Sequence, residues 1–205
     1  MPVATPRSPA WVPPALLAAI EAAYATPPRA YHHFGHVLEV LRDYDDVAQT
    51  LGWRQSDEVL LAILFHDAVY VAGAADNEAR SAALARELVT QHLPDRGLDV
   101  DTVVRLVELT ARHGKLSGEP LDDDARHFLD CDMAILGASP DRYDAYEAAI
   151  AIEYAAVPPP LYRAGRGAFL AGLLAQPRIF LSERFHASHD APARDNLRRA
   201  HAALR

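Results

Sequence analysis

The chain has very little cysteine and no long apolar run. Cys131 is the single cysteine among 205 residues, and one cysteine cannot form an intramolecular disulfide, so we expect a cytoplasmic protein. A membrane helix needs about 20 consecutive apolar residues. No segment approaches that length and no long apolar stretch follows the N-terminus, so we expect neither a membrane partner nor a signal peptide.

Basic residues are also scarce. Lys and Arg number 20 against 28 Asp and Glu, which gives a formal net charge of -8. Broad nucleic-acid binding needs a basic face, so this class of function is not expected. The net charge does not exclude a small anionic substrate, because one bound divalent cation can reverse the local electrostatic field. It does not exclude a homodimer either.

What the sequence does contain is typical of a helical globular protein. Half of the residues are hydrophobic and 23% are charged, and apolar residues recur at three- and four-residue spacing without a convincing alternating strand. We predict an all-α bundle of about eight or nine helices, with residues 1–12 as an irregular arm and 13–205 as one domain. The predicted helices are 14–25, 31–51, 57–70, 77–92, 100–113, 123–136, 140–156, 160–175 and 190–204.

Three of these helix boundaries have local signals. Ser139 precedes Pro140, which suits a helix cap followed by proline at the first helical position. Asp76 is placed to cap the helix beginning at residue 77. His113 followed by Gly114 is typical of a helix end.

His66 and Asp67 end a strongly apolar run that begins at Val59. A buried carboxylate is costly unless it is paired or bound to a metal. On a helix over 59–70 both side chains emerge from apolar stripes, and adjacent positions, about 100° apart, can converge on one ion. The alternative is a core histidine hydrogen-bonded to a neighbour, with Asp67 near a helix C-terminus where the dipole disfavours it.

Two further segments could complete a metal site. His32, His33 and His36 lie within five residues, although spacing alone does not say which would bind, and a solvated face could carry all three. The other segment covers residues 128–137. If it is a helix, Asp132 lies on the same face as its apolar residues, whereas Asp130 lies roughly 200° away around the helix. We therefore predict Asp132 as the buried carboxylate. Asp130 would pair with a cation or form a hydrogen bond that orients one of the metal ligands.

A set of two histidines and two aspartates offers nitrogen and oxygen ligands to one ion. Four protein ligands leave about two positions of an octahedral ion for water or substrate. Such a set suits manganese, iron(II), magnesium or a similar ion better than a structural zinc bound by thiolates.

This pattern resembles the HD-domain superfamily of metal-dependent phosphohydrolases. Its signature is a histidine, a His-Asp doublet and a later aspartate, matched here by His36, His66-Asp67 and Asp132. The chain resembles one bacterial subgroup of predicted HD phosphohydrolases more closely than it resembles the superfamily in general, and this resemblance spans most of its length. The segments that carry this are Arg29–His32, Phe65–Tyr70, Asp76–Ala82, Thr110–His113, Phe128–Gly137, Glu153-Tyr154, Gly165-Arg166 and Ala193–Leu197.

The chain departs from the subgroup at two positions. Ala151 stands where an arginine often precedes the Glu-Tyr pair, which weighs against a supposed phosphate contact. Asp190 stands where the C-terminal motif often begins with glutamate, a conservative difference.

The resemblance implies an HD-type bundle around a divalent metal held by His36, His66, Asp67 and Asp132. The metal would polarise a phosphoryl oxygen and activate a water, which Asp67 could orient. An acidic residue near Glu78 acts on the attacking water in related HD pyrophosphohydrolases, so Glu78 is expected as general base. A helix-dipole acid is the alternative.

The resemblance also implies contacts with substrate. His113 would contact phosphate or shuttle a proton, unless it is only a favourable cation at a helix end. Guanidinium groups match phosphate geometry, although a salt bridge or surface role is the more common one for a single arginine. The expected substrate contacts are Arg29, His32, Asn77, Lys115 and Arg166.

The expected function is hydrolysis of a phosphoester or phosphoanhydride bond in a small phosphorylated compound, with nucleotides among the candidates. A first alternative is a metal-bound, ligand-sensing HD module without catalysis. A second is a di-iron HD oxygenase, which would need His92 and His113 as two more ligands. His92 lies where a helix leads into a loop, which weighs against the oxygenase.

Overall fold

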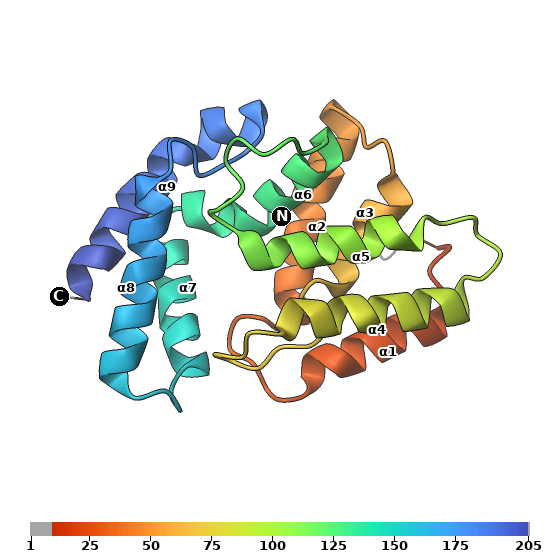
Figure 1. Cartoon of the computed structure of the whole chain (residues 1–205), viewed down its shortest axis with the longest axis horizontal. Coiled ribbons are helices and arrows are strands. Elements are labelled where there is room, and N and C mark those ends of the chain that lie inside the picture. The colour runs from red at the N-terminus through yellow and green to blue at the C-terminus, as the bar shows by residue number, and fades with distance from the viewer. Residues whose placement is uncertain (1–9, 205) are drawn as a thin grey trace, which may run out of the picture. The chain divides into compact units, whose positions relative to one another are not determined.

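The computed structural model describes residues 10–204, and over this range the chain forms nine α-helices and no strand, which confirms the all-α prediction. No helix among these residues is both long and apolar enough to cross a membrane. The chain divides into two compact units, Met1–Ala111 and Arg112–Arg205 (Figure 1). The predicted irregular arm falls mostly on residues 1–9, outside the described range, and the single domain over 13–205 stays a prediction.

The first unit is built around a helix that is apolar from Val59 to its C-terminal end. Its helices are α1 (Pro14–Ala25), α2 (Phe34–Thr50), α3 (Ser56–Phe65), α4 (Asn77–His92) and α5 (Val100–Leu109). All seven residues of α3 from Val59 to Phe65 are buried. A helix that is apolar on every side needs neighbours on every side, and α2, α4 and α5 all pack against it.

Helix α4 contributes a narrow buried stripe. Asn77, Ser81, Ala85 and Val89 follow one another at four-residue spacing, and all four are buried. The stripe packs against α5 and α1, and Figure 1 shows α4 beside α1. Two polar residues therefore share a face with two apolar ones, and they need hydrogen-bond partners there.

The second unit is organised around its C-terminal helix. It contains α6 (Asp123–Met133), the 3-10 turn η2 (Ala134–Gly137), α7 (Pro140–Glu153), α8 (Pro159–Ala175) and α9 (Glu183–Ala203), with a further 3-10 turn, η1 (Thr110–Arg112), at the junction of the units. Helix α9 packs on η2, α7 and α8. A Cβ at Gly137 would lie 2.7 Å from the His189 Cβ atom, so α9 approaches η2 too closely for any residue but glycine. Asn196 Nδ2 donates to the carbonyls of Leu136 and Ala138, both at 2.9 Å.

Two predicted helix boundaries were wrong by five or more residues. The helix predicted over 57–70 ends at Phe65, so His66 is its C-cap and Asp67 lies in the following turn. The helix predicted over 190–204 begins at Glu183, because the Ser182 hydroxyl accepts the Phe185 N–H and starts it seven residues earlier.

The local start signals were only partly right. Helices do begin after Asp76 and Ser139, but neither side chain forms a capping hydrogen bond. Gly114 has a φ of 74°, which fits the predicted break after His113.

Candidate metal centre

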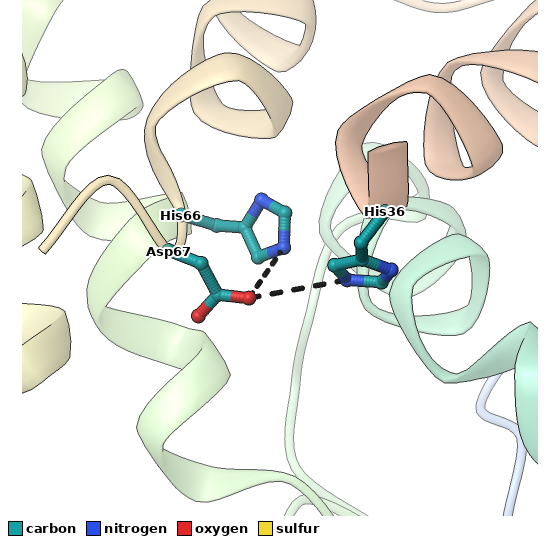
Figure 2. Close-up of side chains that lie close together, drawn as sticks. All are labelled: His36, His66 and Asp67. Atoms are coloured by element: carbon teal, nitrogen blue, oxygen red, sulfur yellow. Dashed lines mark ion pairs between the residues drawn. The ribbon is translucent and has the colours of Figure 1, made fainter. Parts of the chain in front are cut away.

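The structure brings His36, His66 and Asp67 together in the first unit, and we call these three residues the metal triad. One ligand atom from each lies within 4.8 Å of the other two. Figure 2 shows His36 on α2 facing His66 and Asp67 at the end of α3. The Oδ2 atom of Asp67 is 3.1 Å from His66 Nε2 and 3.9 Å from His36 Nε2. The two histidines are buried, with 1% and 4% of their side chains exposed, and the Asp67 side chain is 16% exposed.

The orientation of His66 is fixed by its own helix. Its Nδ1 atom lies 2.7 Å from the Ile63 carbonyl oxygen. A carbonyl can only accept, so Nδ1 carries the proton, and in the neutral ring Nε2 presents a lone pair. Histidine ligands of metals are commonly fixed in this way by a backbone carbonyl.

This arrangement passes a simple test of whether a metal fits. With Nδ1 protonated, Nε2 of neutral His66 faces a carboxylate oxygen at 3.1 Å, and two acceptors that face each other need a proton or a metal cation between them. Atoms bound to one ion at about 2.0–2.2 Å lie about 3–4 Å from each other, and both measured separations fall in that range. The triad could therefore hold a divalent metal ion.

The backbone of Asp67 is held by residues far away in the sequence. Its N–H donates to the Tyr24 hydroxyl at 3.2 Å. Burial raises the pKa of Tyr24 well above its usual value, so this hydroxyl stays protonated. The Asp67 carbonyl accepts from Arg29 Nη1 at 2.5 Å. The backbone of Asp67 is thus held at both its N–H and its carbonyl, although the residue lies outside the helix.

Among the three neighbouring histidines, the structure selects His36 for the triad. His33 is the N-cap of α2, where its Nδ1 accepts the Gly35 N–H at 2.9 Å. His32 stacks on Tyr70 with ring centroids 3.9 Å apart. The His36 ring packs against Tyr31 at 4.8 Å and meets the His66 ring at 5.2 Å.

The loop after Asp67 is pinned by the buried polar residues of α4. The Asn77 amide accepts the Val71 N–H and donates to the Val71 carbonyl, both at 3.0 Å. The Ser81 hydroxyl accepts the Val69 N–H at 3.0 Å and donates to the Val69 carbonyl at 3.2 Å. Asn77 was predicted to contact substrate, and its amide is engaged with the loop. Ser81 was missed, although its four-residue spacing from Ala85 and Val89 was a signal that it would be buried.

Two other predicted site residues lie in the first unit. Arg29 was predicted to contact phosphate, but the structure directs both of its terminal nitrogens at backbone carbonyls, those of Ala23, His32, Asp67 and Ala68. Glu78 is partly exposed in the first turn of α4. Its role as general base stays a prediction.

Asp132, the predicted fourth ligand, lies in the second unit. Its Oδ2 atom is 2.8 Å from His113 Nε2, and the two side chains are 12% and 17% exposed. The predicted metal role of Asp132 and the predicted phosphate or proton role of His113 stay predictions.

The predicted contrast between Asp130 and Asp132 was wrong. Asp130 is the more buried carboxylate, with 1% of the residue exposed, and it accepts the N–H groups of Leu181 and Ser182, both at 2.7 Å. Burial raises its pKa to about 6, although these hydrogen bonds act in the opposite direction. The segment at 181–182 covers the face of α6 that periodicity had left open to solvent.

The remaining predicted substrate contacts lie in the second unit. Arg166 is 9% exposed and donates to Glu147 Oε1 at 2.6 Å, to Glu147 Oε2 at 3.2 Å and to the Tyr146 hydroxyl at 3.0 Å. This is the salt-bridge role that a single arginine most commonly has. Lys115 is exposed in the segment after η1, and its contact with substrate stays a prediction.

No protein-family model, no curated protein and no solved structure matches this chain. The resemblance to the HD superfamily therefore depends on the sequence motifs alone, and the metal triad depends on the geometry described above.

Proposed function

We propose that this protein is a metal-dependent phosphohydrolase of the HD type. The observation that carries the proposal is the lone pair of His66 Nε2 facing Asp67 Oδ2 at 3.1 Å, with His66 Nδ1 committed to the Ile63 carbonyl. That pair with His36 supplies the first three members of the HD signature in one cluster. Two nitrogen ligands and one oxygen ligand suit manganese, iron(II), magnesium or a related ion.

Each residue of the triad has a distinct part in the proposed reaction. When bound, a divalent ion acts as a Lewis acid toward a phosphoryl oxygen and lowers the pKa of a bound water. His36 and His66 would hold that ion, and both side chains are buried. Asp67 would bind it through a carboxylate that is 16% exposed and therefore accessible to water. Glu78 is proposed to accept the proton of that water.

A metal analysis and a substrate screen on the same sample test the proposal. We expect the purified protein to bind Mn²⁺ or Co²⁺, and the loaded protein to hydrolyse at least one member of a broad panel of phosphomonoesters and nucleotides. His66→Ala should lose both the metal and the turnover. A metal-loaded protein that hydrolyses nothing across the panel would instead be a binding or sensing module, and two irons per chain would favour the oxygenase.

A matched pair of variants on α4 tests the general base. Glu78→Ala is expected to lose most turnover while retaining the metal, because general-base catalysis contributes about 10²–10⁴-fold. Glu87→Ala, which removes an exposed acid from the same helix, should leave turnover unchanged. If both variants have wild-type turnover, Glu78 is an ordinary helix-dipole acid.

A further inference from the structure

We propose that Arg29 is a positioning residue that holds the two halves of the metal triad in register through their backbones. The inference rests on the proposed metal binding by the triad. It differs from the phosphate contact that the sequence predicted, because the guanidinium is directed at the protein's own carbonyls.

The guanidinium joins three separate segments. Its Nη1 atom donates to the carbonyls of His32 at 2.9 Å and Asp67 at 2.5 Å. Its Nη2 atom donates to the carbonyls of Ala23 at 3.1 Å and Ala68 at 3.0 Å. Each terminal nitrogen has two N–H groups, so these four bonds account for all the donors on both.

These three segments carry the triad or support it. His32 lies four residues before His36 and leads into the first turn of α2. Asp67 supplies its own side chain to the triad, and Ala68 follows it. Ala23 is next to Tyr24, whose hydroxyl accepts the Asp67 N–H at 3.2 Å. The backbone of Asp67 is therefore held by Tyr24 at its N–H and by Arg29 at its carbonyl.

Only an arginine can make this set of contacts. Its planar fork presents donors in fixed directions, whereas a lysine has one nitrogen with three donors at a single point. The guanidinium also packs against the rings of Tyr24 at 5.3 Å and Tyr70 at 5.8 Å. Arg29→Lys would keep the charge and the alkyl stem but could not reach four carbonyls from different segments.

The electrostatic effect of Arg29 on metal binding has the opposite sign from its positioning effect. A positive charge close to a cation site weakens cation binding. If Arg29 acted through its charge alone, the protein would bind metal more tightly after Arg29 was replaced by a neutral residue. Positioning predicts the reverse. Residues that orient metal ligands without touching the metal typically contribute about 10- to 100-fold to the metal affinity. The direction of the change in affinity therefore distinguishes the two effects.

The experiment is a Co²⁺ titration of the full chain, followed by its visible absorption spectrum and by calorimetry. We expect Arg29→Ala and Arg29→Lys to weaken Co²⁺ binding by about 10- to 100-fold and to change the spectrum. Arg80→Ala, which removes a half-exposed arginine of the same unit, should change neither. Methylguanidinium added to Arg29→Ala, far below denaturing concentrations, should restore part of the affinity and should do nothing for wild type.

Each other outcome overturns the inference. Unchanged or tighter Co²⁺ binding with a wild-type spectrum in both variants would show that Arg29 acts on stability or through charge. Loss of helical circular dichroism in both variants would make Arg29 a general folding residue. If wild type itself binds no Co²⁺, the proposed metal binding fails and the positioning role falls with it, whereas Co²⁺ binding by wild type that is not weakened in the Arg29 variants would overturn the positioning role alone.

Discussion

The side-chain amide of Asn77 forms two hydrogen bonds with the backbone of Val71, one in each direction and both at 3.0 Å. The amide thus pairs with Val71 as a neighbouring backbone would. Together with Ser81, it satisfies the backbone N–H and C=O groups of Val69 and Val71 in the loop that follows the metal triad.

We predict that Asn77→Ala destabilises the protein by about 1–3 kcal/mol, because two partly buried hydrogen bonds to the backbone of Val71 are lost. Urea unfolding followed by circular dichroism measures this change. Thr90→Ala, an exposed substitution on the same helix, should have almost no effect. Unchanged unfolding with a raised KM for substrate would favour the predicted substrate contact instead.

Asp67→Asn is predicted to affect the metal-bound and metal-free proteins differently. An amide at position 67 can donate to the lone pair of His66 Nε2, so the metal-free protein should gain about 1 kcal/mol in unfolding free energy at mildly alkaline pH. It also loses the negative charge that binds the cation, so the rise in melting temperature with added Mn²⁺ should shrink. A full rise with added Mn²⁺ would contradict the ligand role of Asp67.

The pair formed by Arg166 and Glu147 is predicted to be structural. Burial opposes the charged form of Arg166, yet its contacts with Tyr146 and Glu147 outweigh this effect and raise its pKa. Glu147→Ala would leave a buried charge unpaired and should cost about 3–5 kcal/mol. In a double-mutant cycle, Glu147→Ala should lower the unfolding free energy much less in the Arg166→Met background than in wild type. Additive losses would show that the two side chains are not coupled.

Asp190 is predicted to make stability depend on acid pH. Burial alone would raise the pKa of Asp190, but hydrogen bonds from Ile179 N–H and Arg194 outweigh it and hold the pKa below its ordinary value of 3.8. A lowered folded-state pKa contributes stability that is fully present above the ordinary value and is lost as pH falls through the folded-state value.

The matching variant is Asp190→Asn. At neutral pH it should be less stable than wild type by about 1.5–3 kcal/mol, the range for hydrogen bonds to a charged group. The difference should shrink as pH falls below 3.8. Urea unfolding at neutral and strongly acid pH measures it, and a difference that is constant with pH would exclude this source of acid sensitivity.

The sequence prediction that Asp132 is a metal ligand has its own test. Asp132→Ala should weaken Mn²⁺ binding by at least about tenfold if the prediction holds, since ligand sets of this kind share the ion among all members. His113→Ala serves as the comparison, because it removes the observed partner of Asp132 but no member of the predicted four-ligand set. If both variants bind Mn²⁺ as wild type does, the role of Asp132 is confined to its pair with His113.

Helix periodicity was a good guide to the fold and a poor guide to which polar residue is buried. The apolar run from Val59 to Phe65 predicted a central helix, and α3 is buried along that whole run. On α6 the same reasoning chose Asp132 over Asp130, and the structure reverses it. The spacing of apolar residues identifies only the apolar face of a helix. The segment with Leu181 and Ser182, some fifty residues later, covers a different face of α6 and donates two N–H groups to Asp130.

The sequence by itself determined the all-helical architecture, the position of most helices and the residue types available to bind a metal. These follow from local spacing and from the chemistry of each side chain. The family motif already pointed to His36, and the structure brings that histidine to His66 and Asp67. Only the tertiary structure decided that Arg29 and Asn77 form hydrogen bonds with backbone groups. The physical reason is that a polar group takes the partner that packing brings within about 3 Å, and that partner is often far away in the sequence.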